Sequence, residues 1–182
     1  MKIIKSTVLI IALTVSVLQA QIYKNDVKKS SITFYSKAPL EDIEGKSMDF
    51  TAIVNFANDS IVVRILNTSF KFESSLMEEH FNENYMESAK YKYSTFAGKL
   101  STHIDPSKVG TYTTEADGIV DIHGAKQNKK IGVTVLISDN VKVTSEFSVK
   151  LADHNIEIPK IVFQKIAEVV SVKADAVMVK IK

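Results

Sequence analysis

Residues 131–151 read IGVTVLISDNVKVTSEFSVKL, and this stretch decides the fold class. From Val141 to Leu151, apolar residues alternate with polar ones at a period of two, as in a strand with one buried face. The run from Ile131 to Ile137 has the same alternation, and Asp139-Asn140 supplies a turn between the two runs. The stretch therefore predicts an antiparallel β-hairpin.

Similar runs occur along most of the chain, at Ile32–Lys37, Phe50–Phe56, Ile61–Phe72, Thr113–His123 and Ser171–Ile181. In the third run the apolar residues do not keep to one alternating set of positions, which predicts a β-bulge near Asn67. Gly45, between the first two runs, is expected to mark a turn. About eight antiparallel strands at even spacing predict an all-β fold, either a closed barrel or a sandwich.

Between Ser74 and Lys90 the apolar period becomes helical, and Leu76, His80 and Phe81 fall on one face. A serine at 74 or 75, followed by glutamates at 78 and 79, predicts a capped helix start. Residues Ile161–Val169, after Pro159, are a second and shorter helical candidate. We therefore expect one or two short helices packed at the sheet.

The composition excludes several classes of protein. The 182 residues include no cysteine, which rules out disulfides, thiol catalysis and cysteine-ligated metals. The sequence has 23 basic and 21 acidic residues. Two of the basic residues, Lys2 and Lys5, lie in the first twenty positions, so the rest of the chain has 21 of each. A neutral domain gives no electrostatic reason to expect a nucleic acid partner.

The first twenty residues have the order of a secretory signal peptide. Two lysines precede an apolar run of about ten residues, Val8–Val17, which is too short to span a bilayer as a helix. We expect cleavage after Ala20, so that residues 1–20 are a leader and residues 21–182 form one domain in the periplasm or outside the cell. An uncleaved N-terminal anchor remains the alternative.

Known catalytic and nucleotide-binding motifs are absent from the sequence, so we expect no enzyme activity, no cofactor and no metal. His80 and Glu83 share a helix face, but metal binding needs a third ligand that the sequence does not fix. Asp121 and His123 share a strand face and are expected to face solvent. An enzyme using His80, Glu83 and a distant carboxylate is kept as a rival hypothesis.

One long motif resembles a known family. Residues 69–88, SFKFESSLMEEHFNENYMES, resemble the signature of the YceI-like family, and Phe96-Ala97-Gly98 and Asp121-Ile122-His123-Gly124 match two further family elements. The likeness spans Ile32 to Val179. It departs from the family at Lys92-Tyr93-Ser94, where a proline usually precedes the following strand.

The resemblance implies a lipocalin-like antiparallel barrel that encloses a polyisoprenoid or similar long-chain lipid, in a carrier or storage role without catalysis. The predicted lining residues are Phe34, Phe56, Phe70, Phe72, Leu76, Met77, Phe81, Tyr85, Met86, Phe96, Phe147 and Val149. Alternation does not distinguish a hollow lumen from a solid core, so a structural or interaction module of the cell envelope without ligand is the alternative. Transient membrane contact and a homodimer are further open expectations.

Overall fold

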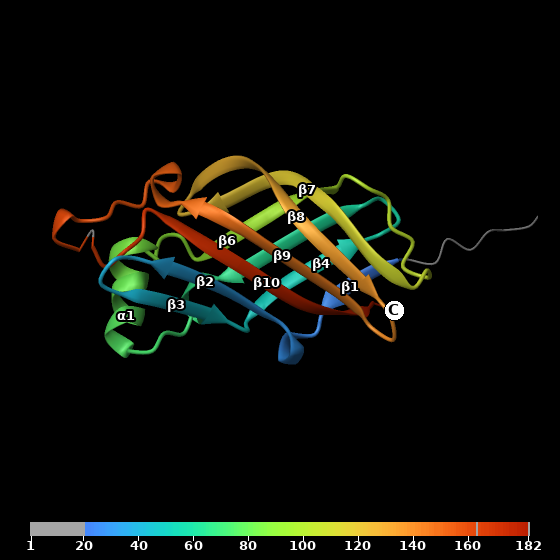
Figure 1. Ribbon diagram of the computed structural model, residues 1–182, viewed down its shortest axis with the longest axis horizontal. Helices are drawn as coiled ribbons and strands as arrows, with labels where there is room; N and C mark the ends of the chain where they lie inside the picture. The colour runs from blue at the N-terminus through green and yellow to red at the C-terminus, as the bar shows by residue number, and fades with distance from the viewer. Residues whose placement is uncertain (1–20, 163, 182) are drawn as a thin grey trace, which may run out of the picture.

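The computed structural model describes residues 21–162 and 164–181, which form an antiparallel barrel (Figure 1). The wall consists, in spatial order, of β1 (Ile22–Asn25), β4 (Phe50–Asn55), β5 (Ser60–Leu66), β6 (Tyr93–Leu100), β7 (Gly110–Ile122), β8 (Ala125–Ile137), β9 (Val141–Lys150) and β10 (Val169–Lys180). Strand β10 pairs back onto β1, with Tyr23 opposite Lys180, which closes the barrel. The predicted all-β, antiparallel, lipocalin-like barrel is confirmed.

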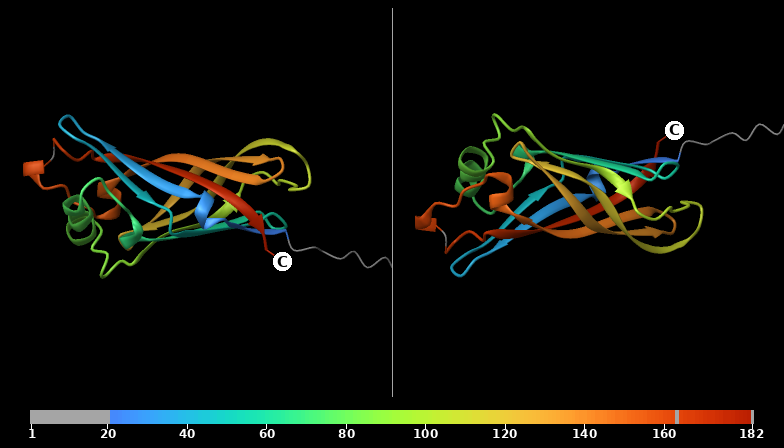
Figure 2. Two further views of the ribbon diagram at one scale, coloured as in Figure 1. Left: turned by 90° about the horizontal axis from the view of Figure 1, so that it is seen from below. Right: turned by 90° about the horizontal axis from the view of Figure 1, so that it is seen from above.

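Two further strands extend the wall at one end. A short turn (Val27–Lys29) separates β1 from β2 (Ser31–Lys37), so both strands pair with β10 but at different heights. Strand β3 (Asp42–Ser47) then pairs with β2. Figures 1 and 2 show the β2–β3 hairpin projecting at the end of the barrel where the helix α1 lies.

The predicted hairpin at residues 131–151 is confirmed: Val135 pairs with Val143, and Ile137 pairs with Val141. The bulge expected near Asn67 is wrong, because β5 ends at Leu66 and a short 3₁₀ turn follows. The reason is that Asn67 is fully buried: its side-chain amide donates to the Tyr91 carbonyl at 2.7 Å and accepts from the Ser94 hydroxyl at 2.8 Å. These bonds hold Asn67 away from the hydrogen-bonded pairing of β5 with its neighbouring strands.

The prediction that Gly45 marks a turn is also wrong. It lies inside β3, directly opposite Phe34 of β2. A Cβ atom at this position would overlap the Phe34 ring and touch Phe72. Glycine is therefore used here because an aromatic ring crosses the backbone closely, which is a packing reason and not a turn signal.

The helix α1 (Ser75–His80) begins as predicted and continues as a π-type turn over Phe81–Tyr85. The Ser74 hydroxyl accepts from the Met77 amide at 3.2 Å and caps the first turn. In the part of the chain that the structure describes, no helix is long and apolar enough to cross a bilayer.

The second helix expected at Ile161–Val169 is wrong for the described residues. Only a short 3₁₀ turn, Lys160–Val162, is present, and Val169 already belongs to β10. Besides local turn bonds, the backbone of this segment makes two bonds to the neighbouring hairpin. The Leu40 amide donates to the Gln164 carbonyl at 2.9 Å, and the Ala167 amide donates to the Ser36 hydroxyl at 2.8 Å.

The two ends of the barrel differ. At the end that carries the termini, Phe56, Ile104 and Val135 are fully buried and fill the interior. At the opposite end, the strands give way to α1, the β2–β3 hairpin and the 3₁₀ turns. The interior is therefore closed at one end, and any opening must lie near α1.

Candidate functional site

The barrel encloses a cavity of about 610 Å³, which is within the normal range for ligand pockets. Its wall is formed by inward-facing side chains of the strands, such as Ile32, Ala52, Val120 and Val133. Because strand side chains alternate between faces, the residues that a strand contributes to this wall are every second one, as with Phe50, Ala52 and Val54 of β4. The lining is overwhelmingly apolar, so the cavity suits a hydrocarbon chain and not a charged solute.

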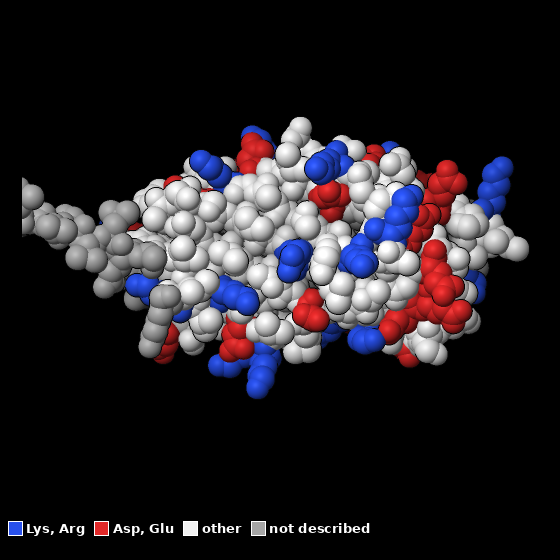
Figure 3. Space-filling view, turned by 180° about the vertical axis from the view of Figure 1, so that it is seen from behind, with Lys and Arg blue, Asp and Glu red and all other residues white. Residues whose placement is uncertain are grey.

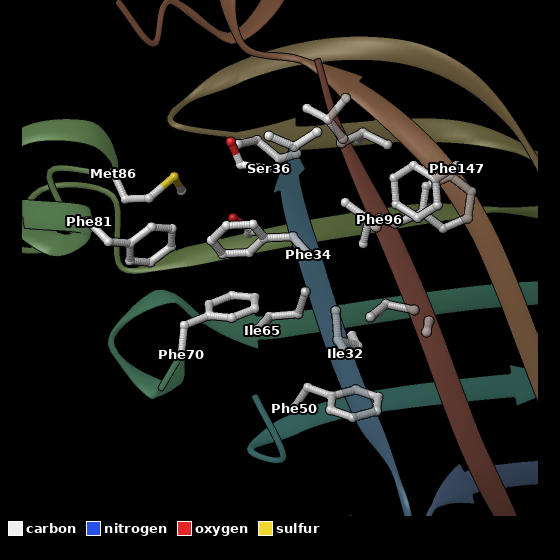
Figure 4. Close-up of a pocket in the computed structure, with 18 of the residues that line it drawn as sticks. Ile32, Phe34, Ser36, Phe50, Ile65, Phe70, Phe81, Met86, Phe96 and Phe147 are labelled. Atoms are coloured by element: carbon white, nitrogen blue, oxygen red, sulfur yellow. The ribbon is translucent and has the colours of Figure 1, made fainter. Parts of the chain in front are cut away.

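Four phenylalanines, which we call the Phe cluster, join α1 to the barrel: Phe34, Phe70, Phe72 and Phe81. The Phe81 ring stacks on Phe34 with centroids 5.4 Å apart and planes inclined by 19°. It also contacts the rings of Phe70 at 5.5 Å and Phe72 at 5.0 Å. Figure 4 shows Phe34, Phe70 and Phe81 close together on one side of the cavity, with Phe96 and Phe147 farther along it. The Phe cluster thus attaches the helix and forms part of the cavity wall.

All of the predicted lining residues except Phe56 lie on the cavity wall: Phe34, Phe70, Phe72, Leu76, Met77, Phe81, Tyr85, Met86, Phe96, Phe147 and Val149. Contact of these residues with a ligand stays a prediction. Phe56 is placed elsewhere. The strand β4 ends at Asn55, and the fully buried Phe56 ring packs edge-on against Tyr23 with centroids 5.4 Å apart, at the closed end.

Many aliphatic lining residues were not among the predicted site residues. They include Ile32, Ala52, Val63, Ile131, Val172 and Met178. Their strand alternation was a sufficient signal for an inward orientation. Small lining side chains such as Ala52 leave room in the lumen.

Polar groups gather at the α1 end of the cavity. The Lys165 ammonium and the Glu41 carboxylate form an ion pair at 3.6 Å, and His80 lies on the same rim. Burial raises the pKa of the Tyr85 phenol above its ordinary value, so this side chain is neutral at physiological pH. The rim thus combines paired charges with neutral polar groups, while the interior is apolar.

The barrel wall is incomplete between β8 and β9. Their ladder stops at the pair Val133–Ser145, although both strands continue toward the α1 end. A 3₁₀ turn, Leu151–His154, covers this seam: the His154 Nδ1 donates to the Ala125 carbonyl at 3.1 Å, and Leu151 lines the cavity. This turn is therefore part of the cavity wall.

The expectation that His123 faces solvent is wrong. The strand β7 ends at Ile122, and His123 adopts a left-handed conformation with φ 53°, which folds its ring onto Tyr91 at a centroid distance of 4.4 Å. Its Nδ1 donates to the His154 carbonyl at 3.0 Å. His123 therefore fastens the turn that covers the seam.

Among residues 21–162 and 164–181, no group of three or more His, Asp or Glu side chains is placed to hold a metal ion.

The sequence of residues 23–178 matches the YceI-like domain, so the chain belongs to the YceI-like family. No curated protein matches the sequence. The family assignment agrees with the resemblance carried by residues 69–88, and it covers almost the whole described chain.

Solved structures with the same fold come from several bacteria. BcnA of Burkholderia cenocepacia is 18% identical, with a TM-score of 0.73 over 86% of this chain and 99% of that one. A polyisoprenoid binding domain of Saccharophagus degradans, implicated in plant cell wall breakdown, is 16% identical, with a TM-score of 0.74 over 88% and 98%. A YceI protein of Campylobacter jejuni is 16% identical, with a TM-score of 0.60 over 76% and 84%. At these identities the likeness concerns the fold.

Proposed function

We propose that this protein binds a polyisoprenoid or similar long-chain lipid in the barrel cavity, as an exported carrier or store without catalysis. The observation that carries the proposal is the apolar cavity of about 610 Å³, closed at one end and opening near α1. The Saccharophagus degradans domain, whose fold this chain shares, is described as polyisoprenoid binding, which supports the same ligand class here.

The chemistry of the cavity fits a hydrocarbon chain. Each buried CH₂ group contributes about 0.8 kcal/mol, so a long chain gains enough from burial to need few polar contacts. Few polar side chains line the interior, and some of them are bonded to the protein, such as the Ser94 hydroxyl, which donates to Asn67. The interior therefore offers little to attract a small polar ligand.

The alternative of a solid-core module without ligand requires side chains from opposite walls to meet across the axis. That arrangement occurs only at the closed end, around Phe56 and Ile104. Over the rest of the barrel, the cavity disfavours this alternative.

Export rests on the sequence alone, because the leader at residues 1–20 lies outside the described residues. We propose that it is cleaved after Ala20 and that the protein works in the periplasm or outside the cell. The mass of the protein recovered from that compartment tests the cleavage site.

The ligand is tested by native mass spectrometry of the full chain, expressed with its leader and purified without detergent or solvent extraction. Ala174→Phe puts a ring into the cavity, and Ala97→Phe adds the same ring on the outer face of β6. We expect a lipid adduct on the wild type and on Ala97→Phe, and at least ~10-fold lower occupancy on Ala174→Phe, because the blocked volume displaces several CH₂ groups.

Circular dichroism of both variants establishes that they are folded. Equal adducts on the two variants would show that the lipid does not occupy the cavity. Absence of any adduct from the wild type would contradict the proposed function.

A further inference from the structure

The end of the barrel where the cavity opens carries large apolar side chains that point into water. Leu40 at the tip of the β2–β3 hairpin is 66% exposed, Leu76 on α1 is 57% exposed, and Ile161 in the last 3₁₀ turn is 92% exposed. We call these three residues the apolar rim. Isolated exposed apolar residues are common on soluble proteins and need no explanation. These three residues, however, lie together at the end where the cavity opens.

The apolar rim is continuous with the cavity. Leu76 belongs both to the rim and to the cavity lining, and Val162, next to Ile161, also lines the cavity. The Leu40 amide donates to the Gln164 carbonyl at 2.9 Å, which holds the hairpin tip and the 3₁₀ turn together as one projection. Figures 1 and 2 show the hairpin tip and the 3₁₀ turn at the same end of the molecule as α1, with the 3₁₀ turn farthest out.

The charges around the rim are arranged unequally. The exposed Lys160 directly precedes Ile161, and a lysine beside an inserted apolar residue extends its ammonium group to the lipid headgroups. The Lys165 ammonium is paired with the Glu41 carboxylate at 3.6 Å, so these two charges largely cancel. On the other side of the opening, Glu79 and Glu83 are exposed on α1 and the turn after it. Figure 3 shows acidic side chains gathered near this end of the molecule. This arrangement lets the projection approach a bilayer but resists a strongly anionic one.

We propose that the apolar rim is a membrane-docking surface, which inserts Leu40 and Ile161 into the headgroup region of a zwitterionic bilayer and presents the cavity opening to the lipid. The inference rests on the proposed function, because it supplies the route by which an apolar ligand moves without crossing water. Apolar tips that insert shallowly into a bilayer bind in proportion to the apolar area they bury.

The test is flotation of the full chain with phosphatidylcholine vesicles. The variant Leu40→Ser/Ile161→Ser removes both apolar tips and leaves the cavity lining unchanged. Val109→Ser is the matched control, because Val109 is 78% exposed but lies in the loop before β7, at the closed end. Each lost side chain should weaken partitioning about tenfold, so we expect roughly a 100-fold loss for the double variant and none for the control.

Three outcomes would overturn the proposal. The first is absence of wild-type binding, the second is equal binding by the double variant, and the third is a self-association that the double variant abolishes in sedimentation velocity without vesicles. Replacing a quarter of the phosphatidylcholine by phosphatidylglycerol should not strengthen binding, and a marked increase would contradict the charge argument.

Native mass spectrometry of the same variants separates this proposal from the proposed function. A lipid adduct without vesicle binding means that the docking surface is wrong and the cavity function stands. Vesicle binding without any adduct means that the cavity function is wrong and the docking surface stands.

Discussion

Phe81→Ala tests how α1 is held to the barrel. The Phe81 ring meets the rings of Phe34, Phe70 and Phe72 at centroid distances of 5.4, 5.5 and 5.0 Å. Aromatic pairs contribute about 0.5–1.5 kcal/mol each beyond area burial, and Phe→Ala at fully buried sites costs about 3–5 kcal/mol. Because Phe81 is only half-buried and the three pairs share one ring, we expect a loss of about 2–3 kcal/mol.

The assay is urea unfolding followed by circular dichroism, on protein freed of lipid so that ligand binding does not contribute. Glu79→Ala is the control on the same helix, where the side chain is exposed and the loss should stay within ~0.5 kcal/mol. A loss for Phe81→Ala no larger than that of Glu79→Ala would refute the anchoring role of the Phe cluster. In the lipid-loaded protein, the variant should also release ligand faster.

Three further substitutions test separate parts of the structure by the same unfolding measurement. Gly45→Ala should cost about 1–3 kcal/mol, because its Cβ overlaps the Phe34 ring; an unchanged midpoint would mean that the ring moves without penalty. Ser74→Ala should cost about 1 kcal/mol through the lost helix cap, and Ser74→Asp should restore it, whereas equal losses for both would contradict the capping role. His154→Ala should cost about 1–3 kcal/mol, because the half-buried Ala125 carbonyl loses the donor that the buried His154 supplies, and should speed hydrogen exchange along β8; unaltered exchange there would argue against the seam closure.

Local periodicity was enough to predict most of the wall. Buried and half-buried residues alternate along the whole length of β4, and one inward face follows directly from that alternation. The cap at Ser74 is likewise encoded within a few residues of itself. These features depend on neighbours in the sequence, so a single sequence carries them.

The features that sequence patterns missed depend on distant residues. Glycine is typical of turns, and the residues next to Gly45 in the sequence do not show that the Phe34 ring crosses it. The segment at 161–169 has helical spacing, but its Gln164 carbonyl and Ala167 amide bond to the β2–β3 hairpin. Phe56 follows the apolar alternation of β4, but the strand ends one residue earlier. Its ring therefore packs against Tyr23 at the closed end and not on the cavity wall.

Whether the barrel is hollow could not be derived from alternation at all. Alternation says which side chains face inward, while the cavity depends on how far apart the opposing walls stand. Small residues such as Ala52 and Ala174 on the cavity wall leave room in the lumen, and their effect appears only when the strands are closed into a barrel.

The central claim is that the cavity holds a hydrocarbon chain, and a crystal structure of the lipid-loaded protein tests it most directly. The protein should be purified from its own compartment under conditions that retain bound lipid. We predict continuous electron density that runs from the opening near Leu76 past Phe96 and Phe147. Its shape should fit a hydrocarbon chain that is unbranched or carries methyl branches. A lumen that contains only ordered water, or that has collapsed so that side chains of opposite walls meet across the axis, would contradict the account.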